Sequence, residues 1–150
     1  MQRRTRNLMC IWIILGGLIN VLVYTVCYAA LGGDARNGWK ETVLNEAGEP
    51  ESRYIISGHF IHGSDVGRKR VVPQWVWIYS FLHSISLWPT EGAMVICMLI
   101  LARPHIIATM KESTWMPGPT FVTVVITITA VLCAAMTLLF SINFIRELCA

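Results

Sequence analysis

The stretch IWIILGGLINVLVYTVCYAAL, from Ile11 to Leu31, contains no charged residue and decides the class of protein. The apolar block that includes it begins at Leu8 and follows a basic leader with Arg3, Arg4 and Arg6. The block is longer than the roughly 7–15 residues of a signal-peptide core and suits the roughly 20 residues of a bilayer-spanning helix. We therefore expect an uncleaved first span over residues 8–31.

Two further apolar blocks follow, Gln74–Ala102 and Thr120–Ile145. Hydrophobic residues make up 55% of the chain and charged residues 14%, whereas an ordinary soluble domain has about 45–50% and about 25%. The second block is long and has Pro89 near its middle. This favours one long, tilted helix kinked at the proline over an interfacial helix at 75–88 with a shorter span starting near Thr90.

The third span is expected to begin after Pro117-Gly118-Pro119, a sequence that stops helices. Three spans place the two termini on opposite sides of the membrane. Lys and Arg are nearly balanced between the sides, and Arg68-Lys69-Arg70 beside the second span argues for the opposite orientation. Because a basic leader on the first span usually dominates, we expect the N-terminus inside, on the cytoplasmic side. The loop 32–73 and the C-terminus are then outside.

The loop between the first two spans carries strand and turn signals. The segments 42–44 and 53–56 flank the turn-forming Glu46–Pro50, and Gly63–Gly67 marks a second turn before 68–72. These patterns predict a three-stranded antiparallel meander. About 40 residues cannot bury a strong core alone, so we expect the meander to rest on its own helices or on a partner.

The loop also contains His59, His62 and Asp65. Two imidazoles and a carboxylate are ligands for a transition metal, so these three residues form a candidate metal site. On a strand, however, residues three apart face opposite sides of the sheet, which favours histidines exposed in a polar loop. The five cysteines show no zinc-type spacing and are interpreted as small hydrophobic residues.

Each span carries small or polar residues at steps of three and four, which place them on one helix face, called a seam here. The first seam is Cys10, Ile13, Gly17, Asn20, Tyr24 and Cys27. The second is Tyr79, His83, Ser86, Thr90, Ala93 and Cys97, and the third is Thr123, Thr127, Ala130, Ala134, Thr137 and Ser141. Small residues and interhelical hydrogen bonds join helices in lipid. Unless the spacing is a chance pattern, the seams predict a left-handed bundle.

His83 and Glu91 are the ionisable side chains well inside a predicted span. Such residues usually face protein or water and mark function. With neighbouring polar residues they form a candidate intramembrane polar site: His83, Glu91, Tyr79, Ser86, Thr90, Asn20 and Tyr24. The site suits a proton or ion pathway, a quinone surface, or one axial ligand for a haem or chlorophyll-type ring. The alternative is structural: a neutral, hydrogen-bonded His83 and a protonated or amide-capping Glu91. No particular cofactor is indicated.

The fold expected for residues 1–150 is one all-α membrane domain with three transmembrane helices and a small extramembrane β-meander. The phosphate-binding glycine loop, nucleophile elbow, HExxH motif and dinucleotide fingerprint are absent from the sequence. The net charge is only +3, and the dispersed basic residues argue against nucleic acid as a partner.

We therefore expect a non-catalytic membrane subunit or assembly protein. Its partners would be lipid and either other membrane subunits or further copies of the chain. The alternatives are a redox or proton-handling subunit that uses His83 and Glu91, and an oligomeric channel or transporter.

Overall fold

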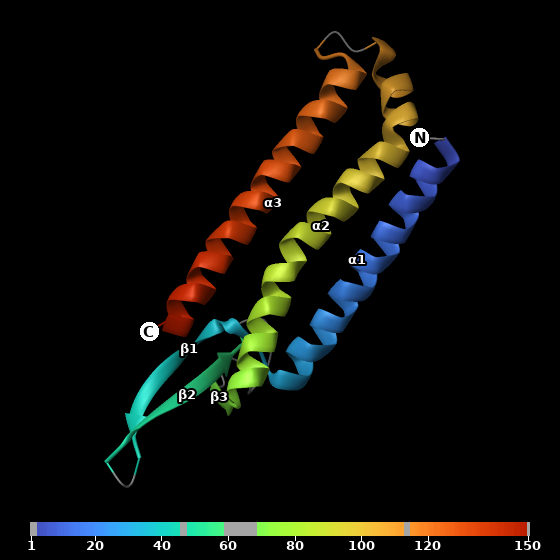
Figure 1. The fold of residues 1–150 in the computed structure, drawn as a ribbon. Helices are drawn as coiled ribbons and strands as arrows, with labels where there is room; N and C mark the ends of the chain where they lie inside the picture. Colours follow the sequence, from blue (N-terminus) through green and yellow to red (C-terminus); the bar gives the residue numbers. More distant parts are fainter. Residues whose placement is uncertain (1–2, 46–47, 59–68, 113–114, 150) are drawn as a thin grey trace. The chain divides into compact units, whose positions relative to one another are not determined.

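A computed structural model of the protein describes residues 3–45, 48–58, 69–112 and 115–149. It contains three long helices, a small sheet between the first two, and one short 3-10 helix (Figure 1). In chain order the elements are α1 (Arg3–Leu31), β1 (Asp34–Leu44), β2 (Pro50–Ser57), β3 (Lys69–Val72), α2 (Gln74–Thr109), η1 (Met110–Glu112) and α3 (Gly118–Cys149).

The three helices are each long and apolar enough to cross a membrane. They contain 29, 36 and 32 residues. At about 1.5 Å per residue each helix is longer than the roughly 30 Å hydrocarbon core of a bilayer. The predicted three apolar helices are confirmed, and they fit a multi-pass membrane protein.

The helix bounds differ from the predicted spans at several ends. The basic leader belongs to α1, which begins at Arg3. The helix α2 is continuous through Pro89 and Pro104 to Thr109, as the prediction of one long helix requires. Its tilt in a membrane and a kink at Pro89 stay predictions.

Our prediction that Pro117-Gly118-Pro119 precedes the third helix was wrong, because Gly118 and Pro119 lie in the first turn of α3. First-turn amides have no acceptor within the helix, so a proline there costs no hydrogen bond. The amide of Phe121 then donates to the Pro117 carbonyl at 3.0 Å.

The predicted antiparallel meander is confirmed, with strand order β1-β2-β3. Leu44 pairs with Pro50 at the far end of the hairpin, and Tyr54 pairs with Val72 across β2 and β3. The strand β1 is longer than the predicted 42–44 and begins at Asp34, with an irregular register between Asp34 and Trp39. Pro50 is the first residue of β2 rather than part of the turn, a position where a strand tolerates proline.

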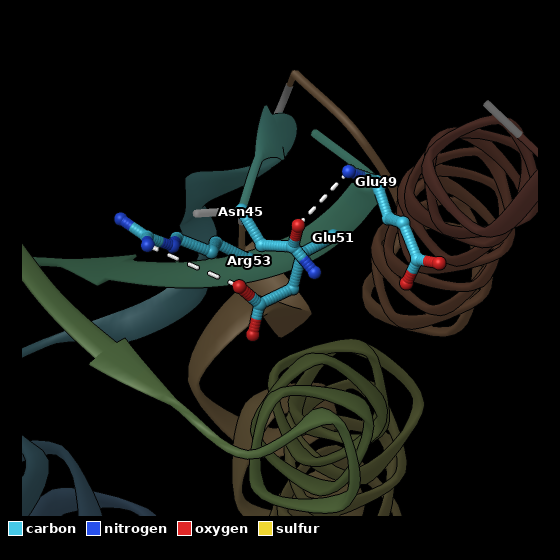
Figure 2. Close-up of polar contacts among 4 residues, drawn as sticks. All are labelled: Asn45, Glu49, Glu51 and Arg53. Carbon is cyan, nitrogen blue, oxygen red and sulfur yellow. Dashed lines mark hydrogen bonds and ion pairs between the residues drawn. The ribbon is translucent and has the colours of Figure 1, made fainter. Parts of the chain in front are cut away.

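Asn45 closes the hairpin turn (Figure 2). Its amide donates to the Glu49 carbonyl at 2.9 Å, and its side-chain Oδ1 accepts from the Glu49 amide at 2.9 Å. Asparagine commonly stabilises turns through such side-chain contacts to the backbone. Arg53 Nη2 and Glu51 Oε2 lie 4.0 Å apart on β2, and both side chains are about half exposed. The second predicted turn, at residues 63–67, lies outside the described residues.

The chain divides into two compact units. The helix unit comprises Met1–Val21 and Leu87–Leu138. The sheet unit comprises Leu22–Ser86 and Leu139–Ala150. Each helix contributes to both units.

The core of the sheet unit is aromatic and is centred on Trp77 of α2, which is fully buried. The Trp77 ring lies 5.2 Å from Phe81 and 6.2 Å from Phe144 of α3, measured between centroids. Tyr54 of β2 contacts the same indole at 5.6 Å. Buried aromatic side chains contribute a large apolar area each. The meander therefore rests on its own helices, the first of the two supports that we expected.

Two cation–π contacts add to the packing of the sheet unit, one between the sheet and a helix and one within the sheet. The Arg36 guanidinium of β1 lies 4.2 Å from the ring centroid of Phe140 on α3. Within the sheet, the Lys69 ammonium of β3 lies 4.7 Å from the Trp39 ring. Such contacts contribute about 0.5–1 kcal/mol each where they are exposed to water.

In the helix unit, α1 and α2 approach closely at Gly17. A Cβ at this position would overlap Met94 Sδ and lie 3.3 Å from Thr90 Cγ2. One turn further along α1, the Asn20 side-chain amide donates to Thr90 Oγ1 at 3.2 Å. Cys10 and Gly17, the buried residues of α1, both belong to the predicted first seam. Close packing at glycine and an interhelical hydrogen bond are the two devices expected in lipid.

The third seam is supported over part of its length. Four of its six residues are exposed: Thr123, Thr127, Ala130 and Ala134. Ala130, Ala134 and Thr137 nevertheless line a pocket between α3 and α2 together with Ala93 of the second seam. The hydroxyl groups of Thr123 and Thr127 donate to carbonyls four residues earlier, at 3.0 and 2.9 Å. Thr137 does the same at 2.7 Å. A threonine that is satisfied by its own helix needs no neighbouring helix, so its spacing carries no information about packing.

Isoleucine at Gly17 should destabilise the protein, whereas isoleucine at Gly16 should not. The Gly17→Ile side chain must displace Met94, and overpacking of this kind costs about 1–3 kcal/mol. A Cβ at Gly16 meets nothing within 4 Å, so Gly16→Ile is a matched control on the same helix. Thermal unfolding in detergent measures both variants. Equal melting temperatures for the two would contradict close packing at Gly17.

Candidate functional site

The Asp34 carboxylate in the sheet unit is 3% exposed and accepts four hydrogen bonds from described residues. Its Oδ2 accepts from the Tyr24 hydroxyl at 2.8 Å and the Ser84 hydroxyl at 3.2 Å. Its Oδ1 accepts from the Asn37 amide at 3.0 Å and from Asn37 Nδ2 at 2.6 Å. A buried carboxylate is tolerated when it is paired or hydrogen-bonded in this way.

The backbone at the C-terminal end of α1 positions Asp34 in this network. The amides of Gly32 and Gly33 both donate to the Tyr28 carbonyl at 3.0 Å and close the helix. Gly33 has φ +148°, and a Cβ there would overlap the backbone of Ser57 on β2. Only glycine combines this backbone conformation with such a close approach. The chain can therefore leave the helix and enter β1 within three residues.

Ser80 and Ser84 of α2 form hydrogen bonds with the first residues of β1. The Ala35 amide donates to Ser80 Oγ at 3.1 Å, and the Ser84 hydroxyl is also within 3.0 Å of the Ser80 carbonyl. Both serines are buried. The Asp34 network thus joins the end of α1, the first residues of β1 and the first half of α2.

His83 lies beside this network between two tyrosine rings. Its centroid is 5.5 Å from those of Tyr24 and Tyr79, both in edge-type geometry. The Tyr79 hydroxyl is 3.9 Å from Cys27 Sγ. A cavity of about 10 Å³ is lined by Asp34, Tyr24 and His83 among others, close to the smallest volume that holds one water molecule. The arrangement brings a phenol, an imidazole and a carboxylate together.

The residues of the predicted intramembrane site fall into both units. Tyr24, Tyr79, His83 and Ser86 belong to the sheet unit, where the Ser86 hydroxyl donates to the His83 carbonyl at 2.7 Å. Asn20, Thr90 and Glu91 belong to the helix unit, and the first two bond to each other. The prediction that these seven residues form one functional site stays a prediction.

Glu91 differs from the other six residues. It is exposed on α2, and within the described part of the chain it makes neither a hydrogen bond nor an ion pair. Glu91 therefore does not cap the backbone amides near Pro89, the structural role that the sequence suggested as an alternative.

The candidate metal residues His59, His62 and Asp65 lie outside the described residues. Over residues 3–45, 48–58, 69–112 and 115–149, no group of three or more His, Cys, Asp or Glu side chains could hold a metal ion. The metal site therefore stays a prediction.

Sequence reasoning missed Asp34, Ser80 and Ser84. A usable signal was present, because Gly32-Gly33-Asp34 directly follows an apolar span and Asn37 stands three residues later. Aspartate often accepts hydrogen bonds from amides two or three residues further on. The two serines gave no comparable signal, since their spacing of four matches any helix face.

Comparisons of this chain with protein-family models, with curated proteins and with solved structures each found no match.

Removing the Tyr24 hydroxyl should destabilise the protein more than removing the Tyr79 hydroxyl. Tyr24→Phe deletes a donor to a buried carboxylate, and a hydrogen bond to a charged group is worth about 1.5–3 kcal/mol. Tyr79 is 47% exposed and its hydroxyl faces only a weak sulfur partner, so Tyr79→Phe is the control. Both variants keep a ring beside His83. Thermal unfolding in detergent compares them, and similar losses of stability would contradict a strong hydrogen bond from Tyr24 to Asp34.

Proposed function

We propose that this protein is a non-catalytic membrane subunit or assembly protein that works bound to another membrane protein or to further copies of itself. The observation that supports this proposal is the exposed carboxyl group of Glu91 in a helix apolar enough to span a membrane. A polar group in this position calls for a partner from outside the chain.

Glu91 lies at the middle of α2, which runs from Gln74 to Thr109. Any stretch of about 20 residues chosen from this helix as the membrane-crossing part includes Glu91. Glu91 therefore lies within a span of this length, and it is deepest in the bilayer when the span is centred on α2.

An acidic side chain in hydrocarbon is costly, by about 2.5–3.5 kcal/mol near the bilayer centre on insertion scales. Such residues therefore face protein or water. Within the helix unit the polar contact of α2 with α1 goes through Thr90 and Asn20, which leaves Glu91 to a donor on another chain. A basic or hydrogen-bonding side chain on a partner helix would meet this need.

The exposed apolar surface of the spans is consistent with contacts to lipid and to other helices. The first two seams have buried members in Gly17 and Cys97, and we propose left-handed packing of α1 with α2 along them. The Gly17→Ile comparison described above tests that contact.

We also propose that the N-terminus is cytoplasmic and that the sheet and the C-terminus are on the opposite side. The basic residues that support this orientation are Arg3, Arg4 and Arg6 at the start of α1, together with Arg103 near the end of α2. Basic residues flanking a span are retained on the cytoplasmic side.

Glu91→Leu should dissociate the complex without destabilising the chain. Blue-native electrophoresis of mildly solubilised membranes should show the wild type well above the size of a 16.9 kDa monomer and the variant at monomer size. The melting temperature of the purified variant should stay close to that of the wild type, because a surface substitution usually changes stability by less than about 0.5 kcal/mol.

Glu147→Gln, at the end of α3, is the matched control and should leave the complex intact. A wild-type protein that migrates as a lone monomer would contradict the proposal. A complex that survives Glu91→Leu would show that Glu91 is not its contact.

Cys149 provides a test of the orientation, because it is exposed at the end of α3. A membrane-impermeant maleimide should label it in intact cells, and Cys149→Ser should abolish that labelling. A cysteine introduced by Arg4→Cys should be labelled only after the membrane is permeabilised. The reverse pattern would place the N-terminus outside.

A further inference from the structure

A second site lies in the helix unit and is lined by basic side chains. A pocket of about 400 Å³ opens there between the beginning of α1 and the second half of α2. Three of its lining side chains are arginines: Arg3 and Arg6 from α1, and Arg103 from α2. The other lining residues are Ile100, Pro104 and Ile107.

The helical periodicity explains why these residues converge. Arg3 and Arg6 are one turn apart on α1 and share a face. On α2, Ile100, Arg103 and Ile107 recur at steps of three and four, which also places them on one face. Two helix faces thus contribute three guanidinium groups and an apolar wall to the same space.

The positive charge of this pocket is not neutralised by the part of the chain that the structure describes. None of the three arginines forms an ion pair with a carboxylate there, and no acidic residue lines the pocket. Arg3 and Arg103 are exposed and Arg6 is half-buried, and an anion that entered the pocket would relieve the repulsion among the three like charges. The pocket therefore has the electrostatics of an anion site.

Arg6 adds a second, independent observation. Its Nη2 donates to the Asn7 side-chain oxygen at 3.4 Å, but its Nε is buried and has no hydrogen-bond partner among the described residues. A buried donor without an acceptor is unfavourable. Guanidinium groups bind phosphate oxygens through two parallel N–H donors, and a phosphate in the pocket would supply the missing acceptor.

We propose that this pocket binds the phosphate of an anionic phospholipid headgroup. The three arginines hold the phosphate oxygens, while Ile100, Pro104 and Ile107 lie along the start of the acyl chains. A free phosphate ion would use the same arginines but would gain nothing from the apolar wall. Basic pockets between transmembrane helices on the cytoplasmic side are typical sites for anionic lipid headgroups, and the orientation proposed above places this pocket on that side. The site is independent of Glu91 and of the proposed complex.

Thermal unfolding of the full chain in dodecyl maltoside tests the proposal. Phosphatidylglycerol should raise the melting temperature by several degrees, because a ligand that binds only the folded state stabilises it. Phosphatidylcholine, whose headgroup is neutral overall, should have a much smaller effect. Equal stabilisation by the two lipids would overturn the proposal.

Substitutions then locate the effect. Arg6→Gln and Arg103→Gln should each weaken phosphatidylglycerol binding about fivefold, the contribution expected of one basic residue at a membrane surface. Native mass spectrometry of the protein–lipid complex measures that change. Arg4→Gln is the matched control, because Arg4 is an exposed arginine at the same end of α1 that does not line the pocket. Equal weakening by Arg4→Gln would show attraction by overall charge and overturn the site.

Inorganic phosphate distinguishes the two sources of the anion. Stabilisation by phosphate that equals stabilisation by phosphatidylglycerol would overturn the assignment to a lipid. If a glutamine variant fails to fold, Arg103→Lys retains the charge and removes the paired N–H donors. This variant should bind phosphatidylglycerol more weakly than the wild type, and unchanged binding would contradict a phosphate held by Arg103.

Discussion

The inability of hydrocarbon to accept or donate hydrogen bonds is the constraint on which the structure depends. Every polar group placed in that medium needs a hydrogen-bond partner from the same chain or from another protein chain. The backbone of the three long helices satisfies itself, and the hydroxyl groups of Thr123 and Thr127 use carbonyls of their own helix. Asn20 and Thr90 satisfy each other across two helices. The hydrogen bond between Asn20 and Thr90 uses two side chains, and it also fixes the contact between α1 and α2.

The same constraint explains the architecture of the sheet unit. Asp34 is the first charged residue after the apolar first span, and it stays in the protein interior because four donors surround it. Those donors come from α1, β1 and α2, so the bonds that satisfy the carboxylate also hold the meander to the helices. The aromatic packing around Trp77 then covers the inner face of the sheet. A sheet too small to have its own core is thereby stabilised by the helices that flank it.

Two groups of charged side chains in the helix unit are not neutralised by described residues. They have opposite signs and different surroundings. Glu91 is a single acid in the middle of an apolar helix, where another membrane helix is the natural source of a donor. The arginines around the pocket lie near the ends of their helices, where lipid phosphates are abundant. These two groups are the basis of our two proposals, a protein partner for Glu91 and a lipid for the arginines.

The sequence by itself determined the three spans, the hairpin and the third strand. The length of an apolar stretch, a period of two and the turn residues are local properties of the sequence. They determine the secondary structure of the segment in which they occur. It also predicted Gly17 and Asn20 on the face of α1 that contacts α2. It failed for Thr123 and Thr127 of the third seam, because a threonine pattern looks the same whether the hydroxyl bonds its own helix or a neighbour.

Only the tertiary structure showed the roles of Asp34, Ser80 and Ser84, and the convergence of Arg3 and Arg6 with Arg103. These residues are about 50 to 100 positions apart in the chain. Spacing within one helix gives the face on which a residue lies. Which faces meet is decided by packing between helices, and that information is not local.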